Sequence, residues 1–293
     1  MDNRLLVARQ SASAGGLLDL VPGAAAAYSL RSLSSTYTDP VVTVRRSSDN
    51  AEDSFTASEV SDGTLAAFCG VGDGFVKQWW DQSGNARHAS QTAAASQPKI
   101  VSGGVVVTED GKPSLSFDGA GDELATPAFS TEIAASVFIV GKADAWHSGA
   151  DYECFFSHGY ATGTSLTKGI VVGYLPNAAF SGWAPGDIVS FGSGYESAPK
   201  AVGPIQAGSD LRLVAAILSA STASHHVNGA LVPATTSTTG NIASLTAPVL
   251  LGSARAGVVV DMLAGTISEV IYYTSDQTAN RELIEGNIAW SYS

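Results

Sequence analysis

The sequence predicts an all-β sandwich, and three observations support this fold class. From residue 40 onward, segments of strand length either alternate apolar and polar residues or run continuously apolar. Glycine, proline, asparagine and aspartate separate these segments at short intervals, which is typical of sandwiches and barrels. The chain is 45% hydrophobic and 14% charged and contains 31 glycines, which favours a sizeable core with many turns. Because sandwiches often exceed about 200 residues as one unit, residues 21–293 are interpreted as a single domain.

The N-terminal residues 1–20 are interpreted as an arm that is either disordered or docked on a partner. A short apolar patch, residues 5–7, precedes a flexible stretch of small residues, 11–16. Pro22 then precedes the run 24–33, which is rich in alanine and other helix formers. This pattern predicts one or two helical turns before the sandwich begins.

The remaining strands follow in order, each bounded by turn residues. The strand candidates are residues 41–47, 74–80, 98–101, 104–109, 113–119, 136–143, 154–159, 168–175, 187–192, 211–219, 225–232, 247–253 and 265–275. The closing segment, 275–292, is different, because its apolar residues recur near helical spacing at Leu283, Ile284, Ile288 and Trp290. It predicts one C-terminal helix, capped by Ser275 or Asp276 and packed on the sandwich.

Charge and composition exclude several classes of partner. The net charge is −12, and Arg45–Arg46 is the one tight basic pair, whereas a nucleic-acid surface needs clustered cations. No apolar stretch approaches the length of a membrane span or of a signal peptide, so we expect no membrane partner and no standard N-terminal export signal. Cys69 and Cys154 allow one disulfide at most, and the sequence does not decide whether they pair.

Four segments resemble laminin G-like domains. They are residues 117–124 (FDGAGDEL), 225–232 (HHVNGALV), 249–255 (VLLGSAR) and the strand and helix that begin at Gly265 (GTISEVIYY). The resemblance implies a concanavalin A-like jelly-roll β-sandwich, here with a short N-terminal helix and one C-terminal helix. Such sandwiches sometimes carry calcium at their rim, so a structural calcium is the one cofactor left open, with Asp118 and Asp122 as its ligands. Asp81, Asp261 and Glu269 are further carboxylates that the fold could bring to this pair.

Two N-terminal blocks resemble the arabinofuranosidase B type catalytic domain and also many phage tail and virion proteins. They are residues 27–53 and 79–91 (WWDQSGNARHASQ). Retaining glycosidases need two facing carboxyl groups, one of them a nucleophile. Aligning residues 180–182 with the family's segment places Tyr174 and Pro176 where its Asp and Glu are expected. The resemblance therefore implies that the scaffold is kept, that no catalytic residue remains, and that the chain is not an enzyme.

The other motifs allow both packing and binding interpretations. Trp79–Gln82 fits a sugar platform, but strand geometry favours one tryptophan in the core and one under a loop. His225 and His226 point to opposite faces of a strand and do not form a metal site. The surface proposed for a glycan or partner consists of aromatic residues in glycine- and serine-rich loops, namely Trp146, Tyr160, Trp183 and Tyr195.

Three functions are compared. The first is a non-enzymatic phage virion protein of the tail or capsid decoration, a homo-oligomer that docks on other virion proteins through its arm and recognises a surface glycan. The second is an extracellular carbohydrate-binding module. The third is an active α-L-arabinofuranosidase that uses other carboxylates, with Glu153, Asp187 and Glu196 as candidates. The sequence favours the first.

Overall fold

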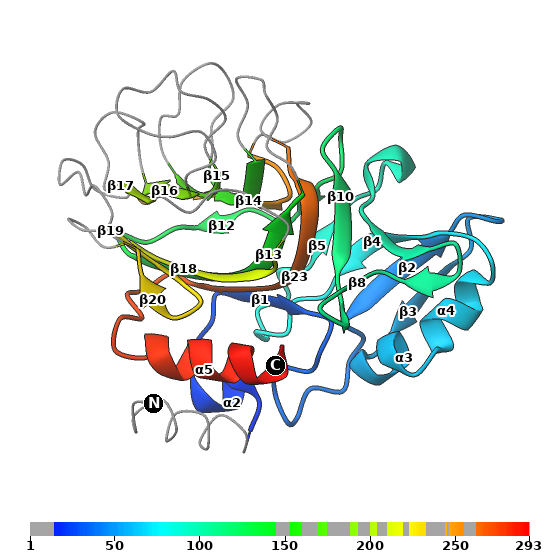
Figure 1. The fold of residues 1–293 in the computed structure, drawn as a ribbon, viewed down its shortest axis with the longest axis horizontal. Coiled ribbons are helices and arrows are strands. Elements are labelled where there is room, and N and C mark those ends of the chain that lie inside the picture. Colours follow the sequence, from blue (N-terminus) through cyan, green and yellow to red (C-terminus); the bar gives the residue numbers. More distant parts are fainter. Residues whose placement is uncertain are drawn as a thin grey trace.

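The computed structural model describes residues 15–144, 153–159, 169–174, 188–192, 200–203, 210–218, 223–232, 244, 246–254 and 262–292. Two sheets face each other to form the predicted sandwich (Figure 1). The inner sheet contains β1 (Ala26–Ser29), β10 (Leu115–Asp118), β13 (Ala135–Ala143), β18 (Arg212–Leu218), β19 (Ala223–Val227), β20 (Ala230–Leu231) and β23 (Ala264–Tyr273). The outer sheet contains β11 (Leu124–Ala125), β14 (Glu153–His158), β15 (Ile170–Tyr174), β16 (Ile188–Gly192), β17 (Lys200–Gly203) and β22 (Val249–Leu251). The all-β sandwich prediction is confirmed.

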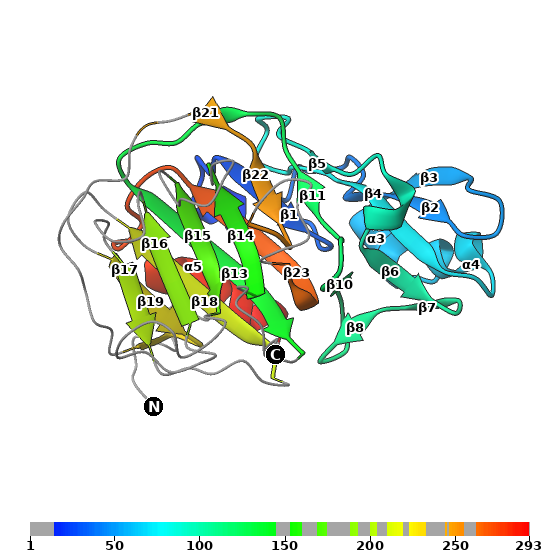
Figure 2. The ribbon, with the colours of Figure 1, turned by 90° about the horizontal axis from the view of Figure 1, so that it is seen from above.

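A smaller antiparallel unit lies beside the sandwich, as Figure 2 shows. Its elements are β2 (Val42–Arg46), β3 (Glu52–Phe55), α3 (Ala57–Ser61), α4 (Thr64–Cys69), β4 (Gly74–Trp79), β5 (Ala89–Ser90), η1 (Ala94–Ser96), β6 (Lys99–Ser102) and β7 (Val105–Val106). Two further two-stranded pairs are described: the hairpin of β8 (Thr108–Glu109) with β9 (Lys112–Pro113), and the long-range pair of β12 (Phe129–Ser130) with β21 (Thr246–Ala247). The unit joins the sandwich where Ser116 of β10 pairs with Lys99 of β6, and where β11 pairs with β5.

Strand β23 is the centre of the inner sheet. One edge pairs with β13 along its whole length, and the other edge pairs first with β10 and then with β1. Nine of its ten residues are buried, because both faces of the inner sheet are covered. Tyr272 faces the core between the two sheets, whereas Ile271 faces a second core under α5 (Arg281–Ser291) and α2 (Leu17–Leu20). A continuous apolar strand is the sequence pattern expected for such two-sided burial.

The helix predictions are partly corrected. The short N-terminal helix exists, but it is α2 at Leu17–Leu20, inside the expected arm, and the alanine-rich run forms strand β1 instead. The C-terminal helix is confirmed as α5, although it begins at Arg281 after Asn280 rather than at Ser275 or Asp276. The carboxylate of Asp276 instead accepts the N–H of Thr278 at 2.8 Å, which closes the preceding turn. Cys69 and Cys154 are both buried, and no disulfide joins them.

Gly252, directly after β22, allows a test of how tightly the chain packs against Phe117 of β10. Its φ is +82°, and an added Cβ would lie 2.2 Å from the ring of Phe117. We expect Gly252→Ala to destabilise the fold by about 2–4 kcal/mol, measured by urea unfolding, through overpacking and the left-handed backbone. Gly229→Ala is the matched control, because Gly229 also has φ +82° but no atom within 4 Å. Equal losses in both variants would contradict the overpacking argument.

Candidate functional site

The Trp79–Gln82 block is structural. Trp79 is fully buried against Tyr28, and the Trp80 indole donates to Thr43 Oγ1 at 2.9 Å. Asp81 Oδ1 accepts the N–H of Ala27 at 2.9 Å, and the Gln82 amide bonds the backbone of the segment after β1. The packing interpretation of this block is confirmed, and its aromatic rings do not form a sugar platform.

A buried ion pair links the end of β1 with β23 and α5. Arg31, just after β1, donates from Nε and Nη2 to the carboxylate of Glu269 on β23 at 2.8 and 2.9 Å. The same Nη2 reaches Asn287 Oδ1 on α5 at 3.0 Å, and Ser29 Oγ donates to Glu269 at 2.8 Å. Glu269 is fully buried. The Glu269 carboxylate therefore holds β1, β23 and α5 together. Because this carboxylate pairs with Arg31, it is not a ligand of the predicted calcium site.

Asp118 and Asp122 come together at the end of β10, as expected for two residues that flank the short glycine-rich turn 119–121. Asp118 Oδ1 accepts the N–H groups of Ala120, Gly121 and Asp122 at 2.8, 3.1 and 3.4 Å. In return, Asp122 Oδ2 accepts the N–H of Asp118 at 3.1 Å. Each carboxyl group is thus fixed by the backbone of the other residue's turn, which holds the pair at one edge of a groove.

The groove, called here the acidic groove, has a volume of about 520 Å³. It lies between β10, β4, β6 and the short helix η1, and its lining residues are Phe75, Ala94, Ala95, Gln97, Lys99, Ser102, Val107, Ser116, Asp118 and Asp122. Lys99 pairs with Asp73 at 2.8 Å, and Gln97 accepts from Arg45 Nε at 2.8 Å. The walls therefore combine an aromatic ring with amide, hydroxyl and ammonium groups, at a size that suits a small ligand.

The two carboxyl groups differ in their electrostatic environment. Asp122 is only 7% exposed, and its pKa is raised from 3.8 to about 7 by burial and by the neighbouring charge of Asp118. A carboxyl group with such a pKa keeps its proton in about half of the molecules at neutral pH. The pair can therefore offer one proton donor and one carboxylate in a single groove, an arrangement used for general acid catalysis.

The calcium prediction at Asp118 and Asp122 stays a prediction. Calcium requires six to eight oxygen ligands. Within the described part of the chain, no group of three or more histidine, cysteine, aspartate or glutamate side chains could hold a metal ion. Asp81 caps backbone groups elsewhere, Glu269 pairs with Arg31, and Asp261 lies outside the described residues.

Most of the other site residues expected from the sequence lie outside the described residues. Outside the described residues lie the proposed binding-surface aromatics and two catalytic candidates: Trp146, Tyr160, Trp183, Tyr195, Asp187 and Glu196. Glu153 is described, and it is buried with its carboxylate accepting the N–H of Ala264 at 2.8 Å. It therefore serves the junction of β14 with β23 rather than an open groove.

The two neighbouring histidines behave as expected for opposite faces of a strand. His225 is fully buried in β19, and neither of its ring nitrogens has a hydrogen-bond partner among the described residues. Burial lowers its pKa to about 3. His226 is only partly buried on the other face, with a pKa lowered mainly by burial. The burial pattern of β19 alternates, so the two imidazoles lie on opposite faces of the strand.

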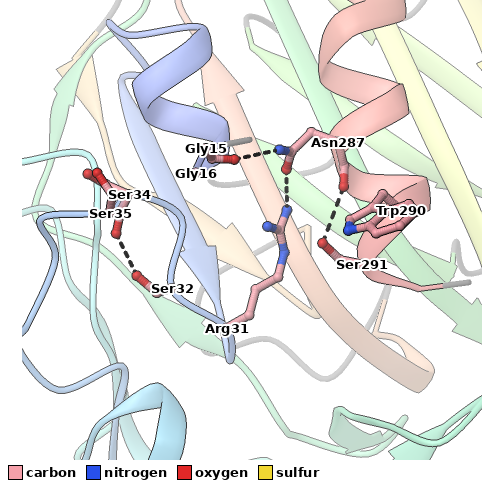
Figure 3. Close-up of a pocket in the computed structure, with 9 residues that line it drawn as sticks. All are labelled: Gly15, Gly16, Arg31, Ser32, Ser34, Ser35, Asn287, Trp290 and Ser291. Atoms are coloured by element: carbon pink, nitrogen blue, oxygen red, sulfur yellow. Dashed lines mark hydrogen bonds between the residues drawn. The ribbon is translucent and has the colours of Figure 1, made fainter. Parts of the chain in front are cut away.

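A second pocket lies under the inner sheet, beside the last turn of α5, and sequence reasoning missed it. Its volume is about 430 Å³, and it is lined by Gly15, Gly16, Arg31, Ser32, Ser34, Ser35, Asn287, Trp290 and Ser291 (Figure 3). Helical spacing predicts that Trp290 packs on the sandwich, but 56% of its surface is exposed. The position of Trp290 in the last turn of α5 is the sequence feature that could have indicated its exposure.

Comparison with known proteins identifies the fold. No protein-family model matches the chain, and no curated protein matches it by sequence. Among solved structures, a GH54 α-L-arabinofuranosidase soaked with a cyclic sulfate inhibitor is 18% identical, with 91% of this chain and 63% of that chain covered and a TM-score of 0.61. An arabinofuranosidase complexed with arabinofuranosyl-α-1,2-xylobiose is 17% identical, with coverages of 91% and 62% and a TM-score of 0.56. A Trypanosoma rangeli sialidase in complex with sialic acid is 12% identical, with coverages of 73% and 31% and a TM-score of 0.50.

These similarities show a β-sandwich of the kind found in glycosidases. The chain spans less than two thirds of the length of the arabinofuranosidases that it matches. The finer resemblances to laminin G-like domains and to phage tail proteins find no support among these structures. Among the described residues, no helix is long and apolar enough to cross a membrane.

The comparisons overturn the prediction of a non-enzymatic virion protein, because the similar solved structures named above are arabinofuranosidases and a sialidase. That prediction depended on Tyr174 and Pro176 in one aligned segment. Tyr174 is the buried last residue of β15, and Pro176 lies outside the described residues. The loss of acidic residues from one segment does not exclude carboxyl groups elsewhere, and Asp118 with Asp122 forms such a pair.

Proposed function

We propose that the chain is the carbohydrate-active domain of a glycoside hydrolase and that the acidic groove is its reaction site. The observation that carries this proposal is the pairing of two carboxyl groups in one groove, one of them with its pKa raised to about 7. Glycosidases need one protonated and one ionised carboxyl group on either side of the scissile bond. Asp122 and Asp118 meet the electrostatic part of that requirement.

Asp122 is the proton donor in this scheme. As the glycosidic bond breaks, its proton moves to the leaving oxygen, so that the departing sugar leaves as a neutral alcohol. Asp118 provides the second carboxylate, which stabilises the positive charge that develops on the anomeric carbon. Water then adds to the anomeric carbon, and the proton that it releases returns to Asp122. The backbone N–H groups that hold Asp118 Oδ1 fix this carboxylate before the substrate arrives, which lowers the cost of organising the transition state.

The walls of the groove suit a sugar ring. Phe75 contributes an aromatic ring, over which Arg45 and Lys99 lie, and Gln97 and Ser116 line the same groove with neutral polar side chains. The fold similarity to arabinofuranosidases favours a pentofuranoside as the first substrate to test, since those proteins share the architecture of 91% of this chain. The substrate class is therefore proposed as an α-L-arabinofuranosyl group on a polysaccharide or oligosaccharide.

The test is turnover of a panel of chromogenic glycosides, with α-L-arabinofuranoside, β-D-xyloside and sialoside members. We expect hydrolysis of the arabinofuranoside. On an arabinofuranosyl oligosaccharide, whose leaving group needs a proton, kcat/KM should fall roughly tenfold for each pH unit above about 7, because Asp122 then loses its proton. Below about pH 7, the donor is protonated and this limb of the profile flattens. The measurement is the pH dependence of initial rates under substrate-limiting conditions.

Chelation separates this proposal from the calcium prediction. If the pair works as acid and carboxylate, EDTA leaves the rate unchanged and millimolar calcium lowers it, because a bound cation would keep Asp122 ionised. Activity that requires calcium would assign the pair to a metal site instead. No turnover of any glycoside on the panel, with the protein folded, would contradict the proposed function.

A further inference from the structure

The pocket beside the end of α5 has the chemical features of a sugar-binding site separate from the acidic groove. The two sites share no lining residue. Figure 3 shows the indole of Trp290 at one wall, with Asn287 and the guanidinium of Arg31 beside it and the serine-rich segment after β1 opposite. We propose that this pocket, called the Trp290 pocket, binds a neutral sugar unit of a glycan chain.

The aromatic wall is the first argument. Trp290 exposes 56% of its surface although it ends a helix whose Ile284 and Ile288 are buried. A sugar ring has an apolar face of C–H groups and an edge of hydroxyl groups, so it matches a tryptophan face surrounded by polar groups. The polar groups here are carboxamide, guanidinium, hydroxyl and glycine backbone, all of which bond hydroxyl groups.

Preorganisation of the polar wall is the second argument. Asn287 Nδ2 donates to Gly15 O at 3.2 Å, and its Oδ1 accepts from Arg31 Nη2 at 3.0 Å. Ser32 Oγ donates to Ser34 O at 2.7 Å, and Ser291 Oγ donates to Asn287 O at 3.2 Å. Because these side chains are already held in place, a ligand would not have to order them on binding.

Charge decides the class of sugar. Among the lining residues that the structure describes, Arg31 is the one cation, and it is neutralised by the two-pronged ion pair with buried Glu269. Asp19 adds a negative charge next to the serine segment, since its carboxylate accepts from Ser34 and Ser35. The pocket therefore offers no net positive charge to an anionic sugar, and its hydroxyl and amide groups fit a neutral one such as a pentose or hexose unit. A volume of about 430 Å³ holds one or two such units.

The experiment measures binding of neutral xylo-, arabino- and galacto-oligosaccharides to the full chain by isothermal titration calorimetry. We expect Trp290→Ala to weaken the affinity by at least roughly tenfold, and Trp290→Phe, which keeps an aromatic face, to weaken it less. Leu231→Ala is the control, because Leu231 is a 64% exposed apolar side chain that does not line the pocket. Its affinity should equal that of the original chain.

The proposal is independent of catalysis in the acidic groove, so the titrations are repeated with Asp122→Asn. Binding that persists in this variant and is lost in Trp290→Ala places the sugar in the Trp290 pocket. Oligosaccharide affinity that is unaltered by Trp290→Ala, in a variant with the original melting temperature, would overturn the proposal. A preference for uronic acid oligomers over neutral ones would overturn the assignment to neutral sugars.

Discussion

Asp122→Asn is expected to lower kcat by about 100- to 10,000-fold on oligosaccharides, which is the usual contribution of a general acid. Asparagine keeps the shape of the side chain. Its amide oxygen can still accept the hydrogen bond that the Asp118 N–H donates to Asp122. On a nitrophenyl glycoside the loss should be much smaller, because that leaving group departs with little help from a proton. The measurement is kcat on both substrate classes, side by side.

The stability of the same variant shows whether it is folded. Because folding raises the pKa of Asp122 from 3.8 to about 7, the folded state holds an extra proton between these values. Its contribution to stability is present below about pH 4 and is lost as the pH rises through about 7. At about pH 8 the asparagine variant should therefore be more stable than the original chain, by about 2 kcal/mol after allowance for solvent screening in an open groove. Equal oligosaccharide turnover in a stably folded variant would exclude Asp122 as the donor.

Arg31→Met is expected to destabilise the fold by about 3–5 kcal/mol, because it leaves Glu269 buried without its cation. Glu269 is fully buried, and its other described partner is the hydroxyl of Ser29. Methionine approximates the length of the arginine stem, so the change removes charge more than packing. Urea unfolding at neutral pH measures the loss.

The double variant Arg31→Met with Glu269→Met is the control for this prediction. Since replacing a whole buried ion pair by apolar side chains is often nearly neutral, the second change should restore most of the stability that the first one removes. A single variant as stable as the original chain would mean that the pair contributes nothing to the fold. An additive loss in the double variant would assign the effect to packing instead.

Sequence patterns predict most strands here, and the exceptions have physical causes. The alanine-rich run has high helix propensity, yet it forms β1, because Ala26 and Tyr28 face one core while Ala27 faces the other. Small side chains allow a strand to sit between two packed layers, and this tertiary context overrides propensity. Helix α3 was missed although its capping box, Thr56 with Glu59, is visible in the sequence.

The candidate site is predictable only in its local part. That Asp118 and Asp122 lie together follows from the short glycine turn between them. The raised pKa of Asp122 does not, because it depends on burial by groove walls such as Phe75 and Gln97, which come from distant strands and turns. In the same way, the wall opposite Trp290 comes from residues 15–35, far away in sequence, and only the fold brings them near.

The position of β23 has a consequence for biosynthesis. Residues 264–273 form the middle of the inner sheet, between β13 on one edge and β1 with β10 on the other. A ribosome must therefore synthesise the chain through residue 273 before the earlier strands find the segment that joins them. Long-range pairing of this kind slows folding and leaves unpaired edges open to aggregation. Nascent chains that stop short of Ala264 would be natural clients for chaperones.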